Sequence, residues 1–385
     1  MKLQIAGGTI HTQEETLANH SIYCSDGVIT EISEGISPRE GYEYVDAAGY
    51  IVGPGGIDMH IHGGGGRDFS EGTDECFRTI ISTHMRHGTT SLFPTLPSAS
   101  NKMIRDAAEI TTRMMAEEGS PVLGLHLEGP YFNMKKCGGQ WPEYIRLAEA
   151  EEYVPLLEQY PCIRRWDAAP ELPGALAFAK ECRKHNVVVG LGHTEADYDD
   201  VQKAREAGYT HATHFYNAMT GVHNVREFKH AGTIESVLLA DEITVEVIAD
   251  GIHVPPVIIQ LIHKVKGAAN IALVTDAMPT TDAPDSEVLD KNTIIEDGVC
   301  KLADRSALAG SIATMDKLID TMINKCHFSW HDAFVMSSLT PARIMAVDNK
   351  KGSLAVGKDA DIVLYDSGAK LNMVIQAGKV FHKTQ

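Results

Sequence analysis

Short apolar runs alternate with helix-patterned segments through the middle of the chain, and this alternation constrains the fold more than any other feature. It is typical of a parallel α/β sheet. The helical segments lie at 74–86, 101–117, 174–184, 196–207 and 257–264. The apolar runs number eight and end near His62, Thr95, Glu128, Ala169, His193, His214, His253 and Asp276. Eight β/α units in about 230 residues fit a (β/α)8 barrel better than an open sheet, with helical stretches near 315–326 and 331–338 completing the ring.

The two ends of the chain consist of short strands and tight turns instead. The segment 21–24 precedes Ser25-Asp26-Gly27, and Asp-Gly between alternating segments is a hairpin signal. The C-terminal end shows the same pattern of short predicted strands, at 352–354, 361–366, 373–375 and 379–381. We therefore predict that residues 1–52 and 347–385 form one small β-sandwich domain. Residues 53–346 then form a barrel domain inserted between its two halves.

Composition and charge narrow the class of partner. The formal net charge of −18 argues against a nucleic-acid groove and against binding to an anionic membrane surface. The seven cysteines are scattered without a C-x-x-C pair, which favours reduced thiols in a cytosolic protein. The N-terminal residues lack the apolar region of a signal peptide, and no stretch approaches 18 uninterrupted apolar residues. We expect a cytoplasmic protein with no nucleic-acid or membrane partner.

The first apolar run ends in a histidine pair, His60 and His62. Side chains two residues apart on a strand share a face, so both imidazoles project from the same end of the strand. Two imidazoles on one face are natural ligands for a metal ion. A chain with 18 histidines also contains such a pair by chance, so the pair alone leaves both alternatives open.

Other predicted strands also end in possible metal ligands. Glu128 ends the run at 124–128, and His193 and His214 each end a later run. Asp276 ends the run at 271–276. Each residue alone is compatible with a solvated or structural role. Together, four histidines, one glutamate and one aspartate at the strand ends of one barrel indicate a metal-dependent active site. His126 should also point inward, and we interpret it as barrel packing.

Several longer motifs narrow the class further. They include L-E-G-P within 125–131, H-x-x-N-A-M within 213–219 and A-D-G-I-H-V at 249–254. The matching stretches are 54–64, 125–131, 192–194, 213–219, 249–254, 274–277, 308–314 and 352–363. On these motifs the chain resembles the amidohydrolase superfamily and, within it, the N-acetylglucosamine-6-phosphate deacetylase family. The resemblance covers nearly the whole chain.

The resemblance implies a metal site and a reaction. Glu128, His193 and His214 would hold one divalent metal ion. His60 and His62 would form a second site, with Glu128 or Asp276 helping, so one or two ions per subunit are implied. The ligand types suit Zn, Fe, Mn and Co almost equally, with zinc as our first choice. The implied reaction is hydrolysis of the acetamide of N-acetyl-D-glucosamine 6-phosphate, with Asp276 as general base and acid.

Two positions depart from the family pattern. Where the family often has a histidine that contacts the substrate amide, this chain has Gln140. Its amide can donate an N–H to a carbonyl oxygen in place of the histidine, but a neutral amide is a weaker electrophile than a protonated histidine, and a surface-loop glutamine is the alternative. The phosphate-binding arginine of the family lies in an R-E-P-G segment, whereas here Arg226 lies one residue later and the proline is missing. In the family this arginine can come from the neighbouring subunit, which implies a homodimer.

The resemblance also implies where the phosphate would bind. It would be held by Arg226, by His253 and by backbone N–H groups near Asn217 and Ala218. The departures leave the sugar open, so a deacetylase of the galactosamine 6-phosphate epimer is one alternative. Another amidohydrolase, such as a deaminase or an N-acyl amino-acid hydrolase, is a second. A non-enzymatic member is a third, but it would be expected to lose ligands that this chain retains.

Overall fold

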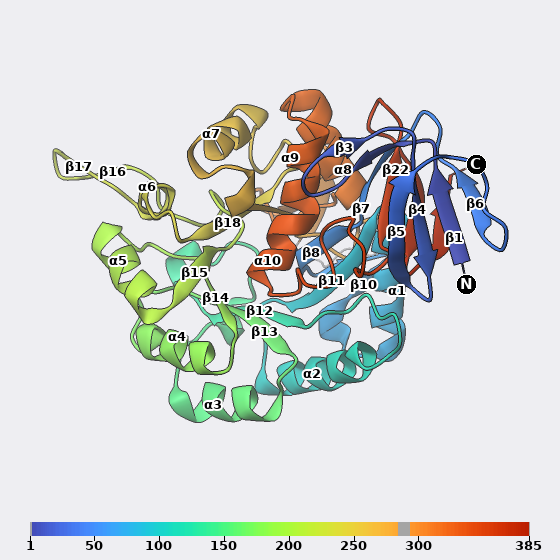
Figure 1. Ribbon diagram of the computed structural model, residues 1–385. Helices are drawn as coiled ribbons and strands as arrows, with labels where there is room; N and C mark the ends of the chain where they lie inside the picture. Colours follow the sequence, from blue (N-terminus) through green and yellow to red (C-terminus); the bar gives the residue numbers. More distant parts are fainter. Residues whose placement is uncertain (1, 284–292, 385) are drawn as a thin grey trace.

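The structure is a computed structural model that describes residues 2–283 and 293–384. Its largest sheet has eight strands in the order β19-β18-β15-β14-β13-β12-β11-β8, and each strand runs parallel to its neighbours. The strands are β8 (Gly56–Ile61), β11 (Thr89–Leu96), β12 (Leu125–Tyr131), β13 (Ile163–Ala168), β14 (Val188–Leu191), β15 (Tyr209–Ala212), β18 (Thr244–Ile248) and β19 (Ile271–Val274). Figure 1 shows helices arranged around the outside of this sheet.

Hydrogen bonds between the first and last strands close the sheet into a barrel. The N–H of Asp276 donates to the carbonyl of His60 at 2.9 Å, and the N–H of His62 donates to the carbonyl of Ala277 at 3.0 Å. The Thr275 hydroxyl also donates to the buried Asp58 carboxylate at 2.6 Å. The predicted (β/α)8 barrel is therefore confirmed, and its closure brings residues more than 200 positions apart into contact.

The helices agree largely with the expected segments. Those foreseen are α1 (Asp74–Arg86), α2 (Asn101–Met115), α4 (Ala175–Lys184), α5 (Tyr198–Ala207) and α7 (Pro256–Lys266). Side-chain caps start several of them: Thr73 accepts from the N–H of Cys76, and Ser100 accepts from the N–H of Met103. After Gly310 the chain forms α8 (Met315–Asp320), α9 (Trp330–Phe334) and α10 (Thr340–Ile344), with π-helical turns at Thr321–Lys325 and Val335–Leu339.

Three local features differ from expectation. Helix α3 (Ala150–Gln159) was not foreseen, and it carries an internal proline, Pro155, which obscures its helical pattern. Helix α6 (Thr233–Leu239) was also missed because it is only seven residues long. The strand end expected near His253 is wrong, since β18 ends at Ile248. The Asp250 carboxylate accepts the backbone N–H groups of Ile252 and His253, and this turn ends the extended chain.

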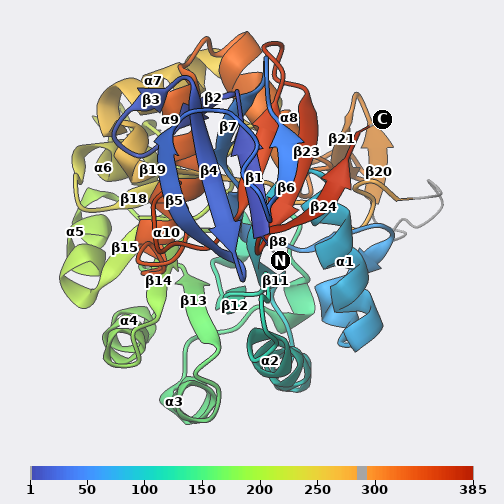
Figure 2. The same cartoon turned by 45° about the vertical axis from the view of Figure 1, so that its right-hand side comes forward.

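Both ends of the chain build two further sheets beside the barrel (Figure 2). One has the order β5-β4-β1-β6 and the other β24-β23-β22-β7-β2-β3. Their apolar faces share one core, to which Ile5 and Ile22 contribute from the first sheet and Ile362 and Ile375 from the second. The strands are β1 (Lys2–Ala6), β2 (Thr9–His11), β3 (Thr16–Leu17), β4 (His20–Ser25), β5 (Val28–Glu34), β6 (Glu43–Asp46), β7 (Ile51–Pro54), β22 (Ile362–Tyr365), β23 (Leu371–Gln376) and β24 (Lys379–Lys383).

The division of the chain into domains stays a prediction. The sheets described above are compatible with a small β-sandwich from 1–52 and 347–385 around a barrel at 53–346. Strand β7 leads directly into β8, with only Gly55 between them, so the two parts are joined by a very short connection. Among the described residues, no helix has the length and apolar character needed to cross a membrane.

Candidate metal centre and active-site cavity

A cavity of about 990 Å³ opens at the C-terminal ends of the barrel strands. This end of a barrel is where such folds carry their active sites. Four of the predicted metal ligands and the predicted general base line it: His62, Glu128, His193, His214 and Asp276. His60 is fully buried directly beneath. The structure therefore brings together all the metal-site residues that the sequence suggested.

Three predicted ligands converge on one point in the cavity floor. Glu128 Oε1 lies 3.0 Å from His193 Nε2 and 3.0 Å from His214 Nε2. The two imidazole nitrogens are themselves 3.0 Å apart. Ligand atoms on a tetrahedral zinc ion lie about 3.3 Å from each other, because each is about 2.0–2.1 Å from the metal. The spacing of these three atoms therefore fits a single divalent cation.

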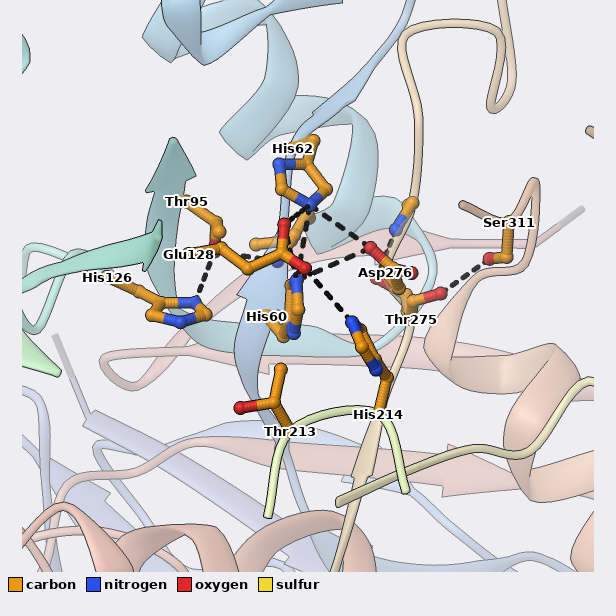
Figure 3. A network of polar contacts seen from close by, with 12 residues as sticks. His60, His62, Thr95, His126, Glu128, Thr213, His214, Thr275, Asp276 and Ser311 are labelled. Atoms are coloured by element: carbon orange, nitrogen blue, oxygen red, sulfur yellow. Dashed lines mark hydrogen bonds and ion pairs between the residues drawn. The ribbon is translucent and has the colours of Figure 1, made fainter. Parts of the chain in front are cut away.

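A second cluster adjoins the first through the other oxygen of Glu128. His62 Nε2 lies 3.2 Å from Glu128 Oε2 and 3.1 Å from Asp276 Oδ1. His60 Nε2 lies 3.4 Å from the same Asp276 oxygen and 3.2 Å from His62 Nε2. Figure 3 shows the Glu128 carboxylate between His62, His60 and His214, with Asp276 alongside. Glu128 is thus placed to contact both clusters.

The backbone at these strand ends turns the ligands toward the centre. His193, His214 and Asp276 have φ values of 46°, 29° and 49°, in a region that residues other than glycine rarely adopt. Each follows its strand by two residues. Such strained conformations persist only where the surroundings determine them, and they concentrate at functional sites.

Hydrogen bonds on the far side of the imidazoles leave the converging nitrogens free for a metal. His193 Nδ1 lies 2.7 Å from the Lys136 carbonyl oxygen, which accepts and never donates. The carbonyl therefore requires a proton on Nδ1 of His193, and Nε2 is the nitrogen that can bind a metal ion. His60 Nδ1 is likewise paired at 2.6 Å with the Glu246 carboxylate. This arrangement is typical of histidines that bind metal ions.

Electrostatics in the metal-free protein reflect the crowding of carboxylates and imidazoles. Burial opposes a charge on His62, but hydrogen bonds to Asp276 and Glu128 outweigh it and raise the pKa of His62 to about 9. For Asp276, burial opposes ionisation, but the charge on His60 and the hydrogen bond to His62 hold its pKa below the ordinary value. The pKa of Glu128 is held well below its usual range by its histidine neighbours despite burial. The carboxylates are thus ionised and attract cations.

Most of the predicted substrate-contacting residues line the same cavity. Gln140 is 7% exposed, which excludes the surface-loop alternative, and its Nε2 donates to Glu128 Oε2 at 2.6 Å. His253 presents a buried Nε2 without a hydrogen-bond partner, while its Nδ1 lies 2.7 Å from Asp250. The Asn217 N–H already donates to the His214 carbonyl at 2.9 Å. The Ala218 N–H has no hydrogen-bond partner among the described residues.

Arg226 does not lie in this cavity. It occupies the exposed turn between β16 (His223–Val225) and β17 (Phe228–His230), and it pairs with none of the described residues. Figure 1 shows this hairpin standing clear of the barrel beside α6. Arg226 is therefore not among the residues that line the cavity of its own chain.

The sequence did not point to several buried charged residues beneath the clusters. Glu246 on β18 and Arg165 and Asp167 on β13 are each fully buried inside the barrel. His126 joins them, with Nε2 2.8 Å from Asp167 Oδ2, which supports its interpretation as barrel packing. A charged residue that interrupts an apolar run, such as Glu246 in T-V-E-V-I, was the available signal.

The comparison with known sequences places the chain in a family. The sequence profile of the amidohydrolase family matches residues 51–381. The match spans the whole barrel and the C-terminal strands. The chain therefore belongs to the amidohydrolase family.

Within this family the chain is similar over nearly its whole length to deacetylases of amino-sugar phosphates. It is 31% identical over 381 residues to an N-acetylglucosamine-6-phosphate deacetylase of Bacillus subtilis, covering 96% of this chain and 95% of that one. It is 30% identical over 379 residues to an N-acetylgalactosamine-6-phosphate deacetylase of Escherichia coli O157:H7, covering 96% of each. A solved aspartate-to-alanine mutant of the Mycobacterium smegmatis N-acetyl-D-glucosamine-6-phosphate deacetylase, in complex with N-acetyl-D-glucosamine 6-phosphate, superimposes with a TM-score of 0.90 at 28% identity and 99% coverage of both chains.

The raised pKa of His62 predicts that metal binding releases protons. Below about pH 9 the metal-free imidazole is protonated, and it must lose this proton to act as a ligand. The apparent affinity for Zn²⁺ should therefore rise between pH 6 and pH 9. Calorimetric titration at pH 7.5 in two buffers of different ionisation enthalpy measures the released protons. His62→Asn should release fewer, and identical heats for the wild type in both buffers would contradict the prediction.

Proposed function

We propose that this protein hydrolyses the acetamide of N-acetyl-D-glucosamine 6-phosphate to glucosamine 6-phosphate and acetate, a step of amino-sugar catabolism. The observation that carries the proposal is the convergence of Glu128, His193 and His214 within 3.0 Å of one another, beside Asp276, at the floor of the cavity. Similarity over 99% of the chain to a deacetylase solved with this sugar phosphate supports the choice of substrate.

We propose that two divalent cations bind, zinc by preference, although Fe, Mn and Co suit the same ligands. One would be held by Glu128, His193 and His214, and the other by His60, His62 and Asp276, which form separate ligand clusters. The position of Glu128 supports two adjacent ions. Its Oε1 lies 3.0 Å from the imidazole nitrogens of His193 and His214, and its Oε2 lies 3.2 Å from His62 Nε2, so each oxygen faces a different cluster.

The residues around the centre have distinct parts in the proposed reaction. A bound divalent cation lowers the pKa of a water molecule and polarises the carbonyl oxygen of the acetamide. Asp276 takes the proton of the attacking water and later gives it to the leaving amine. Gln140 lies against Glu128, so its amide N–H is close enough to contact a carbonyl oxygen bound beside that carboxylate.

The phosphate of the substrate would bind among polar groups that line the cavity. His253 Nε2 is buried, faces the cavity and lacks a partner, so it is available to an anion. The Ala218 N–H is also available, and Asn217 lines the same cavity. Lys136 lines the cavity as well and adds a positive charge. An N–H, an imidazole and an ammonium group together suit a phosphate oxygen.

We propose that the protein is a homodimer in which Arg226 serves the cavity of the neighbouring copy. The hairpin that carries Arg226 exposes Val222, Val225 and Phe228 by 56%, 48% and 62%. Helix α7 exposes a stripe of Val257, Leu261 and Val265, which lie on one helical face. Apolar side chains exposed at this density are typical of a surface that another chain covers.

Deacetylation of the galactosamine 6-phosphate epimer is the second candidate. The 30% identity to an N-acetylgalactosamine-6-phosphate deacetylase nearly equals the identity to the glucosamine enzymes. The two sugars differ only in the orientation of one hydroxyl group. The metal site acts on the acetamide, which both sugars carry. The ligand clusters therefore serve both reactions equally well.

The proposed function is tested by acetate release from N-acetylglucosamine 6-phosphate, its galactosamine epimer and unphosphorylated N-acetylglucosamine. We expect release from a phosphorylated sugar, little from the unphosphorylated one, loss after chelation and recovery with Zn²⁺. The preferred epimer identifies the substrate. No release from all three sugars by protein shown to contain metal would overturn the proposal and favour another amidohydrolase reaction.

Replacement of Asp276 by asparagine should separate metal binding from turnover. The amide oxygen of asparagine still faces His60 and His62, but asparagine takes no proton from water. We expect kcat to fall by about 10²–10⁴-fold, while metal content measured by mass spectrometry stays near that of the wild type. A variant with wild-type kcat would show that another group is the base.

Mixed dimers test the shared site. Arg226→Ala should raise KM for the phosphorylated sugar by about tenfold or more, because an ion pair to phosphate is lost. Asp276→Asn should lower kcat as described above. In a hybrid, the Arg226→Ala subunit receives Arg226 from its partner, so mixing and reassociating the two impaired variants should restore activity at low substrate. If the mixture shows only the summed activity of its parents, Arg226 does not act across an interface.

A further inference from the structure

Glu246 lies on β18 inside the barrel, fully buried below both ligand clusters, and the mechanism above does not use it. Its Oε2 is held by Arg165 and lies 3.3 Å from His211 Nε2. Arg165 is in turn fixed by Asp167, which accepts hydrogen bonds at 3.0 and 2.9 Å. These partners fix the orientation of the Glu246 carboxylate, so that its other oxygen points to the metal centre.

The first contact of that oxygen is with a ligand of the second cluster. Glu246 Oε1 lies 2.6 Å from His60 Nδ1. A carboxylate that accepts the Nδ1 proton makes Nε2 the nitrogen that can bind a metal ion, and this atom lies among Glu128, His62 and Asp276. It also sets the plane of the ring.

The second contact of the same oxygen is with the backbone of a ligand in the first cluster. The N–H of His214 donates to Glu246 Oε1 at 2.8 Å, and the N–H of Phe215 donates to the main-chain carbonyl of Glu246 at 2.8 Å. His214 has the strained φ of 29° that turns its imidazole toward Glu128. Glu246 therefore holds this turn with both its side chain and its main chain.

We propose that Glu246 is a positioning residue that orients one ligand of each metal cluster, His60 through its ring and His214 through its backbone. The proposal rests on the metal centre proposed above but not on the identity of the sugar. An alternative is that Glu246 only neutralises Arg165 in the barrel interior. The two differ in outcome, because only positioning requires the contacts to His60 and His214.

The test is titration of metal-free protein with Zn²⁺ against a competing chelator, without any sugar. Loss of an outer hydrogen bond to a metal-binding histidine lowers affinity by about 10–100-fold, so Glu246→Gln should bind Zn²⁺ more weakly by this factor. Glu246→Asp keeps the charge but is shorter, and positioning predicts a loss here too, whereas charge neutralisation alone predicts near wild-type affinity. His211→Asn is the matched control, since His211 contacts the same carboxylate but none of the proposed ligands.

Each result has a defined meaning. Losses for both Glu246 variants, with His211→Asn within about threefold of the wild type, would support positioning. Wild-type affinity and stoichiometry in Glu246→Gln, or an equal loss in His211→Asn, would overturn it. A wild type that binds no Zn²⁺ would overturn it together with the metal centre, whereas a wild type that binds Zn²⁺ but releases no acetate would leave it standing.

A measurement on the wild type covers the case in which Glu246→Gln does not fold. Nitrogen NMR of histidine-labelled protein loaded with Zn²⁺ distinguishes protonated from metal-bound ring nitrogens. We expect His60 to carry its proton on Nδ1 and to bind through Nε2, as the 2.6 Å contact to Glu246 requires. A proton on Nε2 of His60 would overturn the proposal.

Discussion

Burying charge inside a closed barrel is the constraint on which the rest of this structure depends. Arg165, Asp167 and Glu246 are removed from water, and a buried charge is tolerated only when it is paired and hydrogen-bonded. Arg165 meets both carboxylates, Asp167 also binds His126, and Glu246 also binds His60. Each group therefore has a fixed partner and little freedom to move. Through Glu246, this fixed interior also constrains the His60 ring and the backbone of His214.

The same interior leaves an excess of negative charge where the strands end. In the metal-free protein this charge is balanced in part by histidines, whose pKa values rise because carboxylates surround them. A divalent cation that replaces those protons satisfies the carboxylates and the imidazoles together. The site thus favours cations for a reason that begins in the packing of the barrel. The closure between β8 and β19 is part of that packing, since it brings Asp276 against His60 and His62.

Local patterns were enough to predict the residues whose direction follows from strand periodicity. His60 and His62 share a face at the end of β8, and Glu128 lies on the third strand of the barrel. Other positions depend on contacts that no local pattern contains. In the sequence, Glu246 is one charged residue in a short apolar run. Its contact with the His60 ring joins residues 186 positions apart, so no local pattern reveals it. The turn that ends β18 before His253 depends on the Asp250 carboxylate, which accepts the N–H groups of Ile252 and His253.

The sequence by itself determined the class of fold, the identity of the ligand-bearing strand ends and the family resemblance. Each of these depends on the order and spacing of apolar runs, polar residues and motifs along the chain. Only the tertiary structure decided which ligands converge, that Gln140 is buried against Glu128, and that Arg226 stands outside the cavity of its own chain. The physical reason is that convergence depends on barrel closure and on buried charge pairs between distant residues. Those interactions exist only once the strands are assembled, so the sequence lists the groups and the fold arranges them into a site.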